Sequence, residues 1–292
     1  FYKKVALTLY APLSILGARS YERGNIMSNW LGIEGKVVVV TGGSSGIGES
    51  VVEGLIEAGV KVANFDIAEN DINHENYFFA KVDVTSRESV ETGVKKTLER
   101  FGSLDGVVNN AGINIPALLV DTKQSHSQYE LNDAIFDKMI AINQKGLYIV
   151  AQAVGRVLAQ NKNGVIINMG SESGLEGSEG QSCYAATKAA TYSFTRSWAK
   201  ELGKSNVRVV GLAPGIMEET GLRTIAYEEA LAYTRNISVE QLREGYNKTS
   251  TIPLGRSGKL TEVADAVCYL LSDRSSYITG VTINVAGGKT RG

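Results

Sequence analysis

The segment Thr41-Gly42-Gly43-Ser44-Ser45-Gly46-Ile47-Gly48 has the composition of a phosphate-binding turn. It follows a β-branched run and leads directly into a predicted helix. Glycines let the backbone approach a pyrophosphate closely, and a helix N-terminus offers free N–H groups and a positive dipole end. No Lys-Ser/Thr pair follows the glycines, which excludes a nucleotide-triphosphate P-loop. We expect a dinucleotide to be held here by Gly42, Ser44, Ser45, Gly46, Ile47 and Gly48.

Asp66 ends the next predicted strand, Lys61–Asp66. A carboxylate at this place can accept hydrogen bonds from the hydroxyl groups of an adenosine ribose. It would also repel a 2′-phosphate, and neighbouring Ser44, Ser45 and Ile67 supply no cation to hold one. The sequence therefore predicts NAD rather than NADP as the cofactor.

The composition narrows the possible chemistry further. The chain has 292 residues, 32 glycines, two histidines, two cysteines and a net charge of −1. Near-neutral charge gives no electrostatic footprint for nucleic acid. His74, His126, Cys183 and Cys268 share no metal-ligand spacing, so a metal site is not expected. A Ser-His-Asp triad would have to use one of these two histidines, and both lie in polar, loop-like sequence contexts.

The elements that must position these residues alternate along the chain. Helices are predicted over Ile47–Ala58, from Ser86 to Phe101, and over Leu131–Ala159, Tyr184–Leu202 and Glu262–Leu271. The predicted strands are Lys36–Thr41, Lys61–Asp66, Tyr77–Val82, Leu104–Asn109, Val165–Met169, Val207–Ala213 and Val281–Val285.

This alternation predicts an α/β fold, a single-domain Rossmann-type, doubly wound parallel sheet of about seven strands. Two excursions interrupt it, 113–130 and 214–256, and the second is expected to form a substrate loop or helical lid. In such sheets ligands bind beyond the carboxyl ends of the strands, where these loops emerge.

Residues 1–26 differ from the rest, with Lys3, Lys4, Arg19 and Arg23 against Glu22 alone. The apolar run Val5–Ala18 resembles part of a signal peptide but is too short to span a membrane. Met27 begins an ordinary cytosolic start. We expect 1–26 to be a leader or non-native extension outside the fold, and 27–292 to be the NAD-binding domain. Two cysteines far apart in sequence fit a reducing cytoplasm.

Three motifs in this order resemble the short-chain dehydrogenase/reductase family: TGGSSGIG, Asn109-Asn110-Ala111-Gly112 and Tyr184-Ala185-Ala186-Thr187-Lys188. The likeness covers Ile33 to Gly288. It implies a catalytic set of Asn143, Ser171, Tyr184 and Lys188, with Ser173 as the alternative serine. It also implies cofactor contacts from Asp83, Val84, Asn110, Ala111, Gly112, Tyr184, Lys188, Pro214, Gly215 and Ile216. The family often has a threonine five positions after that proline, but here Glu219 occupies the position and Thr220 follows.

The chemistry of an alcohol dehydrogenase explains the Tyr184 and Lys188 pair. Oxidising an alcohol to a ketone removes the hydroxyl proton while hydride leaves for the nicotinamide. A tyrosine has an ordinary pKa of about 10, too high for a base near neutrality. Lys188, at i+4, shares a helix face with Tyr184, and its charge, with that of the oxidised nicotinamide, should favour the tyrosinate. We expect Tyr184 to be the general base in oxidation and the acid in reduction, Ser171 to bind the reacting oxygen, and Asn143 to support a water-mediated proton path.

The polar segment 171–184 and the segments 220–224, 233–237, 241–246 and 286–292 resemble family members that oxidise a phosphorylated hexitol. Polar residues can pair sugar hydroxyls, and arginine suits a phosphate. The candidate substrate residues are Ser171, Ser173, Glu176, Arg223 and Lys248, while Glu172, Ser178, Gln181, Arg235, Arg243, Arg256, Lys289 and Arg291 remain open. The family is commonly tetrameric, so a homotetramer or homodimer is expected. Three alternatives remain: a dehydrogenase of another polyol or sugar acid such as gluconate, a 3-oxoacyl-carrier reductase, and a nucleotide-sensing protein without catalysis.

Overall fold

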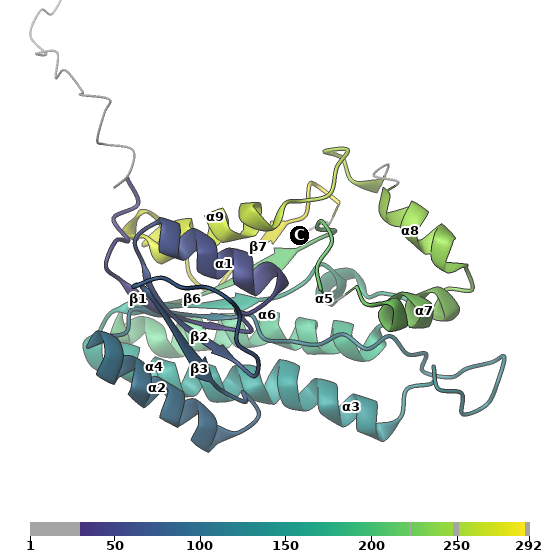
Figure 1. The fold of residues 1–292 in the computed structure, drawn as a ribbon, viewed down its shortest axis with the longest axis horizontal. Helices are drawn as coiled ribbons and strands as arrows, with labels where there is room; N and C mark the ends of the chain where they lie inside the picture. The colour runs from purple at the N-terminus through teal and green to yellow at the C-terminus, as the bar shows by residue number, and fades with distance from the viewer. Residues whose placement is uncertain (1–29, 222, 248–250, 290–292) are drawn as a thin grey trace, which may run out of the picture. The chain divides into compact units, whose positions relative to one another are not determined.

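Strand β1 (Val37–Thr41) lies inside a seven-stranded parallel sheet with the order β3-β2-β1-β4-β5-β6-β7 (Figure 1). The computed structural model describes residues 30–221, 223–247 and 251–289, and the predicted leader 1–26 lies outside these. The other strands are β2 (Lys61–Asp66), β3 (Tyr77–Lys81), β4 (Gly106–Asn109), β5 (Gly164–Met169), β6 (Val207–Pro214) and β7 (Thr282–Val285). The chain reverses its direction of winding between β1 and β4, where a doubly wound sheet opens its ligand crevice.

The helices confirm the predicted alternation. They are α1 (Gly46–Glu57), α2 (Arg87–Phe101), α3 (Asp133–Ile140), α4 (Leu147–Asn161), α5 (Ser173–Glu176), α6 (Ser182–Leu202), α7 (Ile225–Thr234), α8 (Val239–Asn247) and α9 (Leu260–Leu271), with short 3₁₀ turns at Gly203–Ser205 and Asp273–Ser275. Local signals set several ends. Ser86 caps α2, because its side chain accepts from Ser89 N, and Gly102 closes the helix with a φ of 81°.

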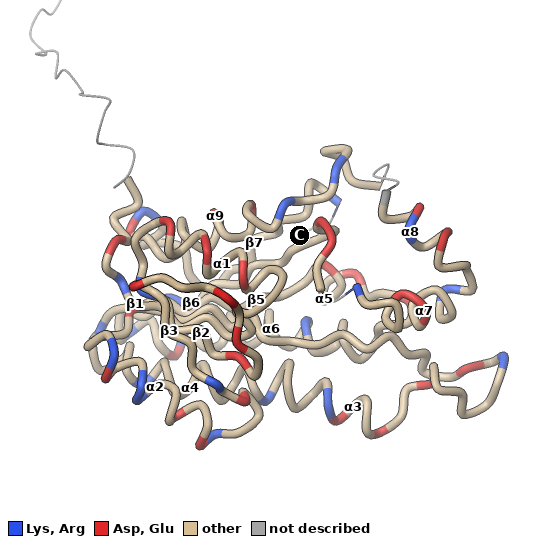
Figure 2. The backbone as a smooth tube through the Cα atoms, viewed as in Figure 1, with Lys and Arg blue, Asp and Glu red and all other residues tan. Residues whose placement is uncertain are grey.

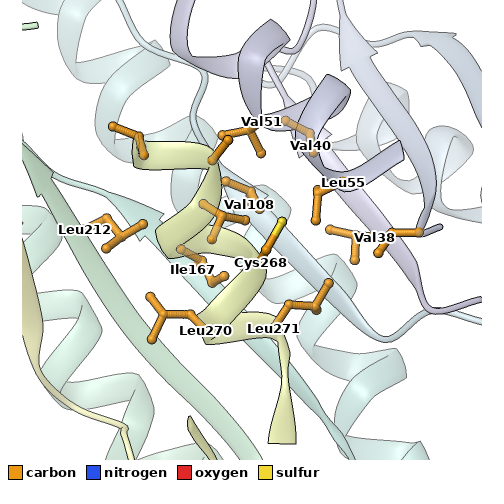
Figure 3. Close-up of a cluster of buried hydrophobic side chains, with 14 of the residues drawn as sticks. Val38, Val40, Val51, Leu55, Val108, Ile167, Leu212, Cys268, Leu270 and Leu271 are labelled. Carbon is orange, nitrogen blue, oxygen red and sulfur yellow. The ribbon is translucent and has the colours of Figure 1, made fainter. Parts of the chain in front are cut away.

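Buried β-branched residues cover both faces of the sheet. Val38 and Val40 face α1 and α9, where they pack with Leu55, Val267 and Leu271 (Figure 3). Val37 and Val39 face the opposite cluster, which α2, α4 and α6 cover. A strand apolar on both faces is expected in a parallel sheet enclosed by two helical layers.

One predicted helix differs from the structure. The helix expected over Leu131–Ala159 is interrupted by a π-helical segment, Ala141–Gly146, between α3 and α4. Asn143 in this segment is 3% exposed and is hydrogen-bonded to the backbone of Ile113. A π segment inserts an extra residue into a helical turn and often occurs at functional sites. Apolar periodicity cannot reveal this insertion, because the residues on both sides remain helical.

The two predicted excursions pack against each other. The lid contains α7 and α8, joined by buried Leu231 and Leu242. Tyr233 of α7 stacks on Tyr129 of the 113–130 loop with ring centres 4.2 Å apart. The Tyr233 hydroxyl also donates to Asp121 Oδ2 at 2.7 Å. The loop is thus a support for the lid.

Charges of both signs are mixed along the surface helices, as α2 illustrates with Arg87, Glu88, Glu91, Lys95 and Lys96 (Figure 2). Across the described residues, no helix combines the length and apolar character needed to cross a bilayer.

Candidate active site

The glycine-rich turn lies between the end of β1 and the start of α1. Gly42 and Gly46 have φ values of 65° and 56°, which favour glycine. A Cβ atom on Gly48 would lie 1.9 Å from the Gly42 carbonyl oxygen and 2.5 Å from Asn110 Nδ2. Only a glycine at position 48 therefore lets the turn fold back onto the first turn of α1. This close packing leaves the N-terminus of α1 beside the crevice.

Two neighbouring loops are tied together by hydrogen bonds. Asn110 Nδ2 donates to the carbonyl oxygens of Thr41 and Gly42, at 3.2 and 3.0 Å. Thr41 Oγ1 accepts from the backbone N–H groups of Asn110 and Ala111, both at 3.0 Å. These bonds fix the glycine-rich turn against the Asn-Ala-Gly loop that follows β4.

Asp66 stands where the sequence predicts it, at the end of β2. Its Oδ2 accepts from Ser44 N at 3.0 Å, and its Oδ1 accepts from Ile67 N at 2.7 Å. The Ser44 hydroxyl donates away from the crevice, to Ala68 O. The turn itself therefore holds the carboxylate at the edge of the crevice.

A cavity of about 570 Å³ occupies this crevice. Its walls include ten of the predicted cofactor residues: Gly42, Ser45, Gly46, Ile47, Asp66, Asp83, Val84, Asn110, Ala111 and Gly112. Ser44 and Gly48 do not line it, and they act through the packing and bonds described above. This lining combines the donor N–H groups of a helix N-terminus with an acceptor carboxylate, a combination that fits a dinucleotide. The positions of the turn that require glycine support this fit, as do the residues that line the cavity.

A second cavity of about 300 Å³ adjoins the first, because Ile47 and Thr220 line both. Tyr184, Gly215 and Ile216 line this second cavity, whereas Pro214, the buried last residue of β6, lines neither of the two. Four predicted substrate residues also line it, namely Ser171, Ser173, Glu176 and Arg223. The fifth, Lys248, lies outside the described residues.

Lys188 lies one turn after Tyr184 on α6, as predicted. Its ammonium is 5.7 Å from the centre of the Tyr184 ring and donates to the carbonyl oxygen of Met169 at 2.8 Å. The residue is 7% exposed, and burial lowers the pKa of Lys188 to about 8. The lysine is thus anchored to the end of β5 behind the tyrosine.

The pKa of Tyr184 is governed by burial. Burial raises the pKa to about 12, and the hydrogen bond with Ser171 only partly opposes this rise. Tyr184 is therefore a phenol at neutral pH, the form that can donate a proton to a carbonyl oxygen. The predicted stabilisation of the tyrosinate depends on the charge of the oxidised nicotinamide together with that of Lys188, and it stays a prediction.

Ser171 is held beside Tyr184 by its neighbours. The Ser173 hydroxyl donates to Ser171 Oγ at 3.0 Å, and the Tyr192 hydroxyl donates to the Ser171 carbonyl oxygen. Ser173 is 8% exposed. These contacts assign Ser173 a supporting position and leave Ser171 as the serine that reaches Tyr184.

The Asn143 side chain is bonded to protein atoms on both sides. Its Oδ1 accepts from Ile113 N and its Nδ2 donates to Ile113 O, both at 2.9 Å. Nδ2 also donates to Thr187 Oγ1 at 3.1 Å. The side chain therefore joins the loop after β4 to α6, the helix that carries Tyr184 and Lys188, and its predicted support of a water-mediated proton path stays a prediction.

Tyr227 and Asn114 line the second cavity without having been singled out from the sequence, whereas Lys289 and Glu172 were open candidates. Tyr227 accepts a hydrogen bond from Gln181 Nε2 at 2.9 Å, and Asn114 has a buried Oδ1 without a hydrogen-bond partner in the described structure. Lys289 forms a 2.6 Å ion pair with Glu172. No spacing in the sequence connects Lys289 with Glu172, and Tyr227 carries no signal beyond its place in the lid. The position of Asn114 just after Asn-Ala-Gly could have indicated it.

The chain resembles known proteins over most of its length. Residues 36–230 match the family model described as short chain dehydrogenase. The chain is 59% identical to the sorbitol-6-phosphate 2-dehydrogenase of Klebsiella pneumoniae, over 91% of this chain and 100% of that relative. It is 36% identical to a 3-oxoacyl-[acyl-carrier-protein] reductase of Thermotoga maritima, over 88% and 98%.

Solved structures have the same fold. The 3-ketoacyl-(acyl-carrier-protein) reductase of Brucella melitensis, complexed with NADH, matches with a TM-score of 0.73 and 27% identity, over 89% of this chain and 100% of that one. The ligand-free aldohexose dehydrogenase of Thermoplasma acidophilum matches with a TM-score of 0.75 and 25% identity, over 89% and 95%.

Proposed function

Because the chain belongs to the short chain dehydrogenase family, we propose that it interconverts D-sorbitol 6-phosphate and D-fructose 6-phosphate with NAD as the cofactor. The observation that carries this proposal is the 59% identity to a sorbitol-6-phosphate 2-dehydrogenase over that relative's full length. The second cavity supports it, because its lining is rich in hydroxyl, amide and charged groups that pair with sugar hydroxyls.

NAD is supported by Asp66 at the crevice edge and by the NADH in the Brucella melitensis relative. Within the described lining of the first cavity, Lys138 is the basic side chain, and it comes from α3 rather than from the β2 end that holds Asp66. A 2′-phosphate near Asp66 would meet a negative charge. When bound, the nicotinamide supplies the hydride acceptor for oxidation and the hydride donor for reduction.

The chain's own residues carry the proton chemistry. In fructose 6-phosphate reduction, protonated Tyr184 donates to the ketone oxygen, and Ser171 donates a hydrogen bond to the same oxygen. In oxidation the tyrosinate takes the hydroxyl proton. The positive charges of Lys188 and of the oxidised nicotinamide oppose the burial that raises the pKa of Tyr184. Asn143 keeps α6 in register with the loop after β4.

A panel of substrates tests this function. Purified protein is supplied with NAD and, in parallel, with sorbitol 6-phosphate, mannitol 6-phosphate and gluconate, and NADH formation is followed. In the reverse direction, fructose 6-phosphate and a 3-oxoacyl thioester are compared with NADH. The proposal predicts the highest kcat/KM with sorbitol 6-phosphate and fructose 6-phosphate. A higher value with gluconate or the thioester would contradict it.

The enzyme is further proposed to act in the cytoplasm as a homotetramer or homodimer. Two observations support this. Cys183 and Cys268 are both free, which suits a reducing compartment. Strand β7 is an edge of the sheet, and Val281 beside it is 47% exposed, as is suitable for pairing with a second copy. Light scattering after size exclusion tests the assembly, and a monomer across concentrations would contradict it.

A further inference from the structure

The lid arginines differ in what their guanidinium groups contact. Arg243 Nη2 lies 2.7 Å from Glu228 Oε2, and Arg256 Nη2 lies 2.5 Å from Glu262 Oε1. Each of these two arginines is therefore neutralised by a carboxylate. The Arg243 pair joins α8 to α7, and the Arg256 pair lies at the start of α9.

Arg223 and Arg235 are held by neutral groups instead. Arg223 Nη2 donates to Met217 O at 3.0 Å, and its guanidinium carbon lies 3.9 Å from the centre of the Tyr246 ring. Arg235 Nη2 donates to Ser178 Oγ at 3.2 Å. Among the described residues, neither has a carboxylate partner. Both are partly buried and line the second cavity, so two guanidinium groups without an ion-pair partner in the described structure meet that cavity.

The other charged groups of the cavity do not take over this role. Lys289 is paired with Glu172 at 2.6 Å. The Glu218 carboxylate accepts from Leu260 N at 2.7 Å, and Glu176 is exposed. A doubly negative ligand would be repelled by these carboxylates. Its stable position is beside the two unpaired arginines, away from the Glu172 pair.

The donor chemistry at Arg223 and Arg235 suits a phosphate group. Each guanidinium has five N–H donors in a planar fork, and among the described residues each donates a single hydrogen bond. Tyr227 lines the same cavity, and its hydroxyl, which accepts from Gln181, keeps its own proton for donation. Partial burial strengthens charge-assisted bonds relative to those at an open surface.

We propose that Arg235 and Arg223 together bind the phosphate group of the substrate and thereby set its specificity for a phosphorylated sugar alcohol over the free one. This inference rests on the proposed function, because it assigns the phosphate of that substrate to two residues of the same site. The phosphate would be bound between the lid, which carries Arg223 and Arg235, and the segment before α6, which carries Ser178.

The test compares Arg235→Gln and Arg223→Gln with the matched lid control Arg243→Gln. For each, kcat/KM is measured with sorbitol 6-phosphate and with sorbitol, and the inhibition constant of inorganic phosphate is measured against sorbitol. We expect the sorbitol 6-phosphate to sorbitol ratio to fall about tenfold to a hundredfold in Arg235→Gln and Arg223→Gln, as for a lost charge-assisted hydrogen bond. The inhibition constant of inorganic phosphate should rise in the same two variants. Arg235→Lys should retain part of the ratio, because it keeps the charge but loses the fork.

In Arg243→Gln, kcat/KM should change by the same factor with both substrates, so the sorbitol 6-phosphate to sorbitol ratio should equal that of the unsubstituted enzyme. The assignment of the phosphate to these arginines would be overturned if Arg235→Gln and Arg223→Gln left both the substrate ratio and the inhibition constant of inorganic phosphate unchanged. That result would leave the proposed function intact. Failure of the unsubstituted enzyme to use sorbitol 6-phosphate would instead overturn the proposed function. A fall in the ratio with Arg243→Gln equal to that with Arg235→Gln would show a general lid effect and would also overturn the assignment.

Discussion

Replacement of Lys188 by methionine should stabilise the protein while removing its activity. Lys188 is 7% exposed, and its pKa falls from 10.5 to about 8 because burial disfavours the ammonium. At pH 7 this difference corresponds to about 3 kcal/mol of folding free energy, which the charged side chain costs the native state. Methionine fills a similar volume without a charge, but it leaves the Met169 carbonyl without its 2.8 Å bond, a loss of about 1–3 kcal/mol.

The pH dependence separates these two contributions. Because the pKa of Lys188 is lower in the native state, the unfolded chain binds more protons than the native protein between pH 8 and 10.5. The contribution of Lys188 to the free energy of unfolding is therefore present above pH 10.5 and is lost as pH falls to 8. The cost of the charge thus falls from about 3 kcal/mol at pH 7 to about 1 kcal/mol at pH 9.5. Tyr184 titrates higher and is present in both proteins, so its contribution cancels in the difference.

The assay is urea unfolding of the unsubstituted enzyme and Lys188→Met at pH 7 and pH 9.5, at one protein concentration. The stability of the variant relative to the parent should decrease by about 2 kcal/mol between the two pH values. Activity should be lost at both. If the difference in free energy of unfolding between the two proteins did not change with pH, Lys188 would not be a buried ammonium that destabilises the native state.

Two further predictions concern the cofactor crevice. Asp66→Asn removes the charge but keeps an acceptor oxygen for Ser44 N. In steady-state kinetics, kcat/KM with NAD should fall, and the ratio of kcat/KM with NADP to that with NAD should rise about tenfold. An unchanged ratio would contradict the role of the charge. Gly48→Ala places a Cβ 1.9 Å from the Gly42 carbonyl oxygen. The variant should therefore have a KM for NAD raised at least about tenfold, or a free energy of unfolding lowered by about 1–3 kcal/mol. The control is Gly245→Ala, whose Cβ would meet nothing within 4 Å. Equal behaviour of the two glycine variants would argue against a close-packed turn.

The parts of the fold that sequence predicts best are those set by local pattern. The buried run of β1 and the Ser86 and Gly102 signals around α2 place their elements within a residue or two. The π segment at Ala141–Gly146 escapes such patterns, because its cause is tertiary. The amide of Asn143 pairs with the backbone of Ile113, which lies 30 positions away in the chain.

The candidate site divides in the same way. Tyr184, Lys188 and the glycine-rich turn are recognisable from spacing within one or two elements. The lid cations are not, because Arg223, Arg235, Arg243 and Arg256 look alike in sequence and differ only in their partners. A carboxylate such as Glu228 becomes a partner of Arg243 through the packing of α7 on α8. The pKa of Tyr184 is likewise not predictable from the sequence, because the burial that raises it depends on tertiary packing.

The most direct test of the account follows NADH formation from sorbitol 6-phosphate by the purified protein and by Tyr184→Phe, with fructose 6-phosphate assayed as the product. We predict stoichiometric NADH and fructose 6-phosphate from the unsubstituted enzyme, and a rate lower by at least about a hundredfold in Tyr184→Phe, the scale of lost general acid–base catalysis. Absence of NADH with the unsubstituted enzyme, or equal turnover by the two proteins, would contradict it.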